Sequence, residues 1–293
     1  MKKIIIIILC ASSLLAATAL FATGPRETES SVREIISSNP QQQLVRLTRY
    51  ENQHISGVDA ASAFDIYLVQ SHETKVVAEI SEELEGRLDL SLGNDGIVRV
   101  RLSSGRTNRN SVMKVTVYLP ELTYLKASGA TTVHSTGVFN SSNAEIILSG
   151  ASDLKSLNLN TSGKMKVQCS GAANGSILSK SGTAELQVSG ASDLTLNLIC
   201  GNITLSCAGA SDLAITGEAD SATMTISGGS DLSAGGFAVR RLDVTASGAS
   251  DARVWAVDEL RAKATSASDL RYKGNPPVFE TSSSSAGSVK RMN

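Results

Sequence analysis

Ser149-Gly150-Ala151-Ser152-Asp153-Leu154 is the stretch that decides the fold, because it returns along the chain. It recurs at residues 189–194, and altered copies lie at 128–132, 170–174, 208–213, 227–232, 247–252 and 266–270. The aspartate position therefore falls at residues 132, 153, 174, 193, 212, 231, 251 and 269, in steps of 21, 21, 19, 19, 19, 20 and 18. A repeat of near-constant period indicates that one structural unit is stacked on the next.

Between the repeated phrases, apolar and polar residues alternate. Residues 194–198 (LTLNL) and 203–206 (ITLS) have this pattern, and glycines such as Gly163, Gly182 and Gly201 lie between the two runs. Alternation with a period of two is typical of a β-strand. Each unit therefore reads as strand, glycine turn, strand and Gly-Ala-Ser-Asp turn. The sequence predicts an all-β protein, a β-solenoid with coils of about 19–20 residues.

Aligning the coils tests this prediction. The residue after the aspartate position is Val133, Leu154, Gly175, Leu194, Leu213, Leu232, Ala252 or Leu270, and the residue five before it is Ala127, Leu148, Cys169, Val188, Cys207, Ile226, Ala246 or Ala264. Both columns are almost wholly apolar, so we expect two interior ladders with coils about 4.8 Å apart. Cys169 and Cys207 would then lie two coils apart, too far for a disulfide.

The segment before the repeats has strand patterns of its own. We expect strands at residues 64–69, 75–80, 87–92, 97–102 and 112–119, with a hairpin turn at Asn94-Asp95-Gly96. The predicted organisation is a polar linker over residues 23–43, an N-terminal β cap with the first coils over 44–126, and the repeat solenoid over 127–293, ending in a serine-rich stretch. The cap would cover the open end of the solenoid.

The first residues predict export. Lys2 and Lys3 precede an apolar run that reaches Phe21, and small residues then offer cleavage sites after Ala19 and Ala22. This is typical of a signal peptide, here residues 1–22, with an uncleaved N-terminal anchor as the alternative. We expect no membrane span after cleavage and a location in the periplasm or at the cell surface. The net charge of −1 gives no reason to expect nucleic-acid binding.

The aspartate column raises the question of a metal. Asp193, Asp212, Asp231, Asp251 and Asp269 would occupy consecutive coils. Carboxylates stacked about 4.8 Å apart repel one another, so something must offset the repulsion. We expect each aspartate to cap its own turn by accepting backbone N–H bonds. The alternative is a column of Ca²⁺ ions, which prefer oxygen ligands, although there is only one carboxylate per coil. No other cofactor is expected.

Catalytic residues are not expected. His54, His72 and His134 are scattered without metal-ligand spacing. Ser152 and Lys155 match the Ser-x-x-Lys pattern of penicillin-recognising enzymes, but they lie in the repeated turn and the companion motifs are absent. The single tryptophan, Trp255, is expected to cover the last coils. Coil length varies too little for the long loops that build a catalytic groove.

An ordered set of motifs carries a family resemblance. These are Gly57-Val58, residues 64–70 (FDIYLVQ), 115–122 (VTVYLPEL), 125–130 (LKASGA), the repeats, 274–277 (GNPP) and 284–288. In this order they resemble the putative auto-transporter adhesin, head GIN domain family of secreted proteins from Bacteroidetes-type bacteria, over about residues 45–290. The resemblance implies a right-handed β-helix-like fold and export.

The expected function is therefore non-catalytic binding at the cell envelope. Polar outer faces rich in Ser, Thr, Asn and Lys would bind a glycan or a protein partner. An alternative is a structural envelope module that self-associates as a homo-oligomer through its end coils. A third reading is a polysaccharide-active β-helix enzyme. The family analogy supports the first reading only by association.

Overall fold

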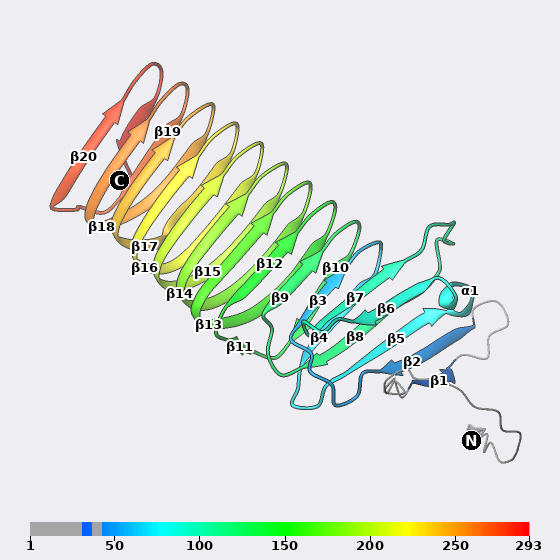
Figure 1. The fold of residues 1–293 in the computed structure, drawn as a ribbon. Helices are drawn as coiled ribbons and strands as arrows, with labels where there is room; N and C mark the ends of the chain where they lie inside the picture. The colour runs from blue at the N-terminus through cyan, green and yellow to red at the C-terminus, as the bar shows by residue number, and fades with distance from the viewer. Residues whose placement is uncertain (1–30, 37–42, 293) are drawn as a thin grey trace, which may run out of the picture.

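The computed structural model describes residues 31–36 and 43–292 of the chain. They form an elongated rod in which successive coils stack along one axis, with a broader sheet at the N-terminal end (Figure 1). The described elements are strands apart from one short helix, α1 (Glu82–Glu85). The predicted all-β solenoid is confirmed.

Long strands that bend once in the middle make the regular coils. They are β13 (Asp153–Cys169), β14 (Asn174–Val188), β15 (Asp193–Cys207), β16 (Asp212–Ile226), β17 (Asp231–Ala246) and β18 (Asp251–Ala264). Each pairs in parallel with the next. Shorter strands make the flanking coils: β9 (Tyr124–Ala127), β10 (Thr132–Thr136), β11 (Phe139–Ser141) and β12 (Ala144–Leu148) on one side, and β19 (Asp269–Lys273), β20 (Val278–Ser283) and β21 (Ser288–Arg291) on the other.

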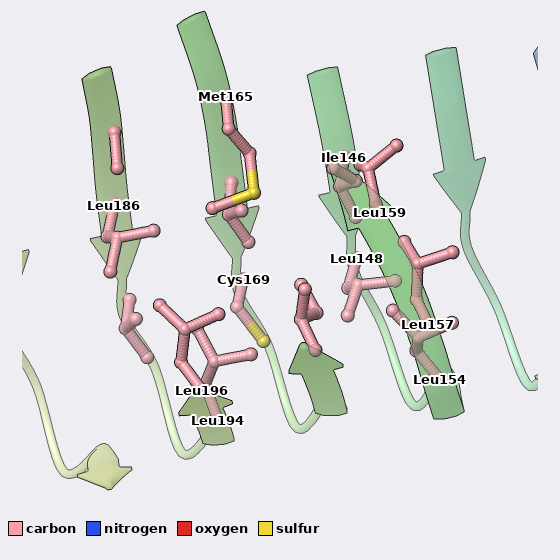
Figure 2. Packing of buried hydrophobic residues seen from close by; sticks show 14 of the residues in the cluster. Ile146, Leu148, Leu154, Leu157, Leu159, Met165, Cys169, Leu186, Leu194 and Leu196 are labelled. Atoms are coloured by element: carbon pink, nitrogen blue, oxygen red, sulfur yellow. The ribbon is translucent and has the colours of Figure 1, made fainter. Parts of the chain in front are cut away.

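The strand register confirms both predicted ladders. Leu194 pairs with Leu213 in one ladder, and Cys207 pairs with Ile226 in the other. These side chains are buried, and Figure 2 shows how leucine, isoleucine, methionine and cysteine side chains of neighbouring coils pack against one another. Burying one aliphatic side chain contributes about 1.5–3 kcal/mol, so the ladder is the main source of stability. Cys169, Cys200 and Cys207 are buried and free, which agrees with the prediction for Cys169 and Cys207.

Glycine and serine make the repeated turn. The turn glycines from Gly129 to Gly248 have φ angles between 72° and 87°, a region that favours glycine. The serine before the aspartate position then points back into the turn. Ser211 Oγ donates a hydrogen bond to the Ala208 carbonyl at 2.8 Å, and Ser192, Ser250 and Ser268 make the same bond in their own coils.

The cap joins the solenoid through two strands. It contains β2 (Leu44–Arg49), β5 (Lys75–Ser81), β8 (Met113–Leu119) and the hairpin of β6 (Leu88–Leu92) and β7 (Ile97–Leu102). The last four confirm four of the five predicted strand regions, and the fifth, at residues 64–69, is confirmed in the first coil. The first coil is formed by β3 (Gly57–Ala60) and β4 (Asp65–Gln70). β8 pairs antiparallel with β5 and parallel with β4, and β4 pairs in parallel with β10, so the sheet changes from mixed to parallel at β8.

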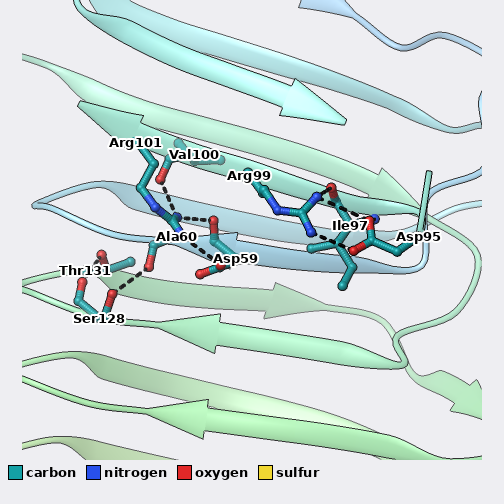
Figure 3. A network of polar contacts seen from close by, with 9 residues as sticks. All are labelled: Asp59, Ala60, Asp95, Ile97, Arg99, Val100, Arg101, Ser128 and Thr131. Carbon is teal, nitrogen blue, oxygen red and sulfur yellow. Dashed lines mark hydrogen bonds and ion pairs between the residues drawn. The ribbon is translucent and has the colours of Figure 1, made fainter. Parts of the chain in front are cut away.

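Ion pairs reinforce this junction (Figure 3). Arg101 Nη2 lies 2.6 Å from Asp59 Oδ2, which links β7 to β3. Arg99 Nη2 lies 2.6 Å from Asp95 Oδ2 and braces the predicted hairpin turn. Beside them, Ser128 and Thr131 begin the series of hydroxyl groups that bond to the backbone of the repeated turns.

Two elements depart from the sequence prediction. Within the segment expected to be a linker, β1 (Val32–Ile35) pairs antiparallel with β2, and Arg33 of β1 bonds Glu85 of α1 at 2.8 Å. The four-residue helix α1 was also not predicted. The predicted signal peptide, residues 1–22, lies outside the described residues. Among those that are described, no helix has the length and apolar character to cross a membrane.

Candidate functional site

A groove of about 1110 Å³ lies on the outside of the rod. It follows the bend in the middle of each coil and runs from Asn140 in β11 to Val257 in β18, and we call it the bend groove. Asn140, Asn160, Lys180 and Ile199 occupy one register column of its lining. The groove therefore lies across the strands, parallel to the axis of the rod. It spans roughly six coil spacings, or about 29 Å.

Amide and hydroxyl groups line the N-terminal half of the bend groove. Asn160 Nδ2 donates to Asn140 Oδ1 at 3.2 Å, and the backbone N–H of Lys180 donates to Asn160 Oδ1 at 3.2 Å. Ser142 and Ser162 are exposed beside this amide pair. The asparagine side chains are thus held in place by the coil stack, while their remaining polar atoms stay available to solvent.

Charged groups of both signs line the C-terminal half. Glu218 and Asp220 project from β16, and Arg240 projects from β17. Arg240 Nε lies 3.7 Å from Asp220 Oδ1, and both side chains are about two-thirds exposed, so this ion pair is weak. The lining as a whole carries no strong excess of either charge.

Small side chains form the floor. Ser141, Thr161, Ser181, Cys200 and Ala219 follow one another in register. The hydroxyl oxygens of the first three are buried without a hydrogen-bond partner, which is uncommon for buried polar atoms. Burial raises the pKa of the Cys200 thiol to about 12, so this cysteine is a neutral small residue and no nucleophile at neutral pH.

The sequence did not predict this groove. Coil length is nearly constant, and from it we expected no groove built by long loops. The hollow arises because each long strand bends near its centre, at positions such as Gly201. The column of small hydroxyl residues at 141, 161 and 181 was the available signal in the sequence.

The aspartate column is in register as predicted, but the expected turn caps are wrong. Asp193 pairs with Asp212, and the column continues through Asp231 and Asp251 to Asp269. In the described structure, the carboxylates of Asp193, Asp212, Asp231 and Asp251 are exposed and make no hydrogen bond to their turns. The preceding serine bonds the turn instead, since its buried hydroxyl donates to a turn carbonyl, as in Ser192 and Ser250.

Metal binding at these aspartates stays a prediction. Within residues 31–36 and 43–292, no three His, Cys, Asp or Glu side chains converge on a common point. Asp269 bonds Ser288 Oγ at 2.6 Å and also bonds Arg271, and these contacts lower the pKa of its carboxyl group. Asp153 is paired with Lys155. The central carboxylates have no such neighbour.

The other residues discussed in the sequence analysis lie away from the bend groove. Ser152 is fully buried in its turn, and its pattern partner Lys155 pairs with Asp153. The His134 ring on β10 stacks on the Tyr67 ring on β4 at 4.6 Å, while His54 and His72 lie outside the strands. The ring of Trp255 carries Lys273 Nζ at 4.0 Å. None of these residues lines the bend groove.

Comparison with known families gives an extended match. A model described as "Putative auto-transporter adhesin, head GIN domain" matches residues 54–183 and 158–276, which include most of the cap and the repeats. No curated protein matches the chain.

Solved structures share the architecture. A putative adhesin from Parabacteroides distasonis ATCC 8503 is 18% identical with a TM-score of 0.63, covering 85% of this chain and 97% of that chain. A putative adhesin from Parabacteroides merdae ATCC 43184 is 17% identical with a TM-score of 0.62, covering 92% and 98%. A third structure from P. distasonis, described as a putative lipid binding protein, is 19% identical with a TM-score of 0.56, covering 85% and 97%. At these identities the likeness shows the fold alone.

Proposed function

The chain belongs to the putative auto-transporter adhesin, head GIN domain family, and from this premise we propose that it is a non-catalytic, adhesin-like protein of the cell envelope that binds a partner along the bend groove. The predicted signal peptide supports export, to the periplasm or the cell surface. The single observation that carries the proposal is the continuity of the bend groove over the strands from β11 to β18.

The lining chemistry supports a polar partner. One structural neighbour is described as a putative lipid binding protein. A lipid tail requires a mostly apolar cavity, whereas the bend groove presents amides, hydroxyls and charges, with Ile199 and Val257 as isolated exposed apolar residues. We therefore propose a glycan or protein partner.

A catalytic role is not part of the proposal. Acid–base cleavage of a glycosidic bond uses two carboxyl groups that flank the bond. Glu218 and Asp220 project from the same strand onto the same wall of the groove, and Asp220 is paired with Arg240.

The test is binding of the mature chain to isolated bacterial envelopes. Ser162→Arg places a long charged side chain in the bend groove, and we expect it to abolish retention on the envelopes. Ser206→Arg is the matched control, because Ser206 is equally exposed but lies on the second strand of its coil, away from the groove. Equal retention of the two variants and the unmodified chain would contradict the proposal.

A second candidate, self-association, rests on β20. Val278 and Phe279 of this strand are 54% and 49% exposed. Phe279 is in register with the fully buried Leu260, so it continues an interior column. On this reading Phe279→Lys abolishes a concentration-dependent rise in mass during sedimentation. A mass that stays monomeric at every concentration would remove this candidate.

A further inference from the structure

We propose that the ligand of the bend groove is an uncharged linear glycan that lies parallel to the axis of the rod, with successive sugar rings on successive coils. The proposal rests on the binding site proposed above and adds the chemical class of its ligand. It follows from the direction of the groove, the availability of hydrogen-bonding groups and the distribution of charge.

The direction of the groove requires an extended ligand. Each coil contributes equivalent positions to the lining, as the register of Asn160, Lys180 and Ile199 shows. Equivalent positions therefore repeat every 4.8 Å or so along the groove. A pyranose chain linked through equatorial bonds advances by a similar distance for each ring, so one ring can lie on each coil, with alternate rings turned over. An extended peptide repeats its side-chain direction about every 6.6 Å and falls out of step.

The backbone in the bend groove is not available to a peptide. Peptides that bind sheets usually add a strand to a free edge. Here the coil-to-coil ladder continues through the lining residues, for example from Ile199 to Glu218, so both sides of each strand are occupied. The ligand must therefore be recognised by side chains.

Those side chains suit hydroxyl groups. An asparagine amide donates two hydrogen bonds and accepts others, and a serine hydroxyl does both. Within the described structure, Asn140 Nδ2 and the hydroxyls of the exposed Ser142 and Ser162 have no hydrogen-bond partner. Spare donors and acceptors on neighbouring coils match a ligand that carries a hydroxyl on each repeat. The unpartnered hydroxyls beneath them, at Ser141 and Thr161, add to this surplus.

The absence of side chains at the bend keeps the path clear. Gly182 and Gly201 follow Ser162 at the bend on the next two coils. A Cβ atom on Gly182 would lie 2.7 Å from the Ser162 carbonyl oxygen, and one on Gly201 would lie 3.0 Å from the Gly182 carbonyl oxygen. The close stacking therefore favours glycine here, and in this column no side chain stands between Ser162 and Asp220.

The charge distribution favours a neutral ligand over a polyanion. Toward its C-terminal half the lining has Glu218 and Asp220, and the only cations are Lys180 and Arg240 among the residues that the structure places in the lining. Arg240 is already beside Asp220. A sulfated or uronic-acid chain would meet like charges, and like charges at short range are unfavourable. A neutral chain meets none.

The test is calorimetric titration of the mature chain with β-1,4-linked glucose and N-acetylglucosamine hexasaccharides, and with a sulfated hexasaccharide. We expect at least one neutral hexamer to bind, independently of salt concentration. Ser162→Arg should weaken that binding by about tenfold or more, whereas Ser206→Arg should leave it unchanged. Asn140→Leu, which removes the free amide without adding bulk, should also weaken it. Circular dichroism confirms that each variant is folded.

The experiments distinguish an error in the proposed glycan ligand from an error in the proposed binding site. No binding of either neutral hexamer, or salt-dependent binding of the sulfated one alone, would overturn the proposal. Envelope retention that is abolished by Ser162→Arg and also by protease digestion of the envelopes would keep the site but identify a protein partner. Retention that survives protease and is lost in Ser162→Arg supports the glycan. Retention unaffected by Ser162→Arg would reject both proposals.

Discussion

At the scale of single residues, the repeated turn depends on one backbone conformation. Gly209 has φ = 87°, and a Cβ atom there would lie 2.7 Å from the Gly190 carbonyl oxygen of the preceding coil. Left-handed backbone disfavours a side chain, and the stacked coil cannot move away without breaking its ladder. The glycine therefore recurs once in every coil because each turn has no room for a side chain at this position.

Gly209→Ala is expected to lower the free energy of unfolding by about 1–3 kcal/mol, measured by denaturant titration. Gly229→Ala is the matched control in the next coil. Its Cβ would approach no atom closer than 3.9 Å, and Gly229 has no positive φ. This change should be neutral or stabilise by up to about 1 kcal/mol, because it restricts the unfolded chain. Equal effects of the two changes would be inconsistent with the turn described here.

At the scale of elements, the ladder explains why sequence reasoning located the coils. Leu213 stacks between Leu194 and Leu232 and is 1% exposed. Leu213→Asp buries an unpaired carboxylate and should cost at least about 3 kcal/mol, enough to unfold the domain. Thr225→Asp, an outward position of the same strand, should change the melting temperature little. A Leu213→Asp protein that melts like the unmodified chain would refute the ladder.

A cluster of ion pairs around Glu79 links three strands of the cap. Glu79 on β5 accepts bonds from Lys114 Nζ at 2.7 Å and from Arg46 Nη2 at 2.6 Å, so it joins β5 to β8 and β2. The hydrogen bond from Lys114, then that from Arg46, lowers the pKa of the Glu79 carboxyl group. A carboxyl group with a lowered pKa in the folded state stabilises the protein above its unfolded pKa, and this contribution is lost as the pH falls through the folded value.

Glu79→Gln should therefore destabilise the chain by about 1 kcal/mol at pH 7, with the difference shrinking below about pH 4. Unfolding titrations at a series of pH values measure it. Glu73→Gln serves as the control, since Glu73 is 82% exposed and lies 3.8 Å from Lys75. A constant difference between Glu79→Gln and the parent at every pH would contradict the assigned ion pairs.

The sequence predicted elements wherever side-chain periodicity sets the structure. The coil register and strands such as β7 follow from alternation and from the repeat. Three features did not follow. The helix α1 has only four residues, and β1 exists because it pairs with β2. The bend groove depends on the angle between two halves of a strand. Apolar alternation is interrupted at the bend, where Gly201 and Asn202 separate the buried Cys200 and Ile203, so it locates the bend but carries no information on that angle.

At the scale of the whole molecule, the aspartate column bears on how the rod is stiffened. If calcium binds between the carboxylates from Asp193 to Asp269, millimolar calcium should raise the melting temperature relative to EGTA, because a ligand of the folded state stabilises it. The structure favours an unchanged melting temperature, since no three potential metal ligands converge among the described residues. A calcium-dependent rise that is lost in Asp212→Asn would assign a metal to the column.

The bend groove runs along the rod across the strands from β11 to β18. A ligand in the bend groove would contact many coils at once, each through a few weak hydrogen bonds. Such binding gains affinity with ligand length and loses it when one coil is blocked. This is the physical sense in which a repeat protein with little aromatic surface can act as an adhesin-like binder.

The bend groove is tested most directly with an environment-sensitive dye at Ser162→Cys. Cys10 belongs to the predicted signal peptide, and the three cysteines that the structure describes are buried, so labelling of the mature chain is selective. The same dye at Ser206→Cys is the control. On adding envelope fragments, our account predicts a saturable fluorescence change at position 162 and none at position 206. A change at position 206 alone, or equal changes at both positions, would contradict binding in the bend groove.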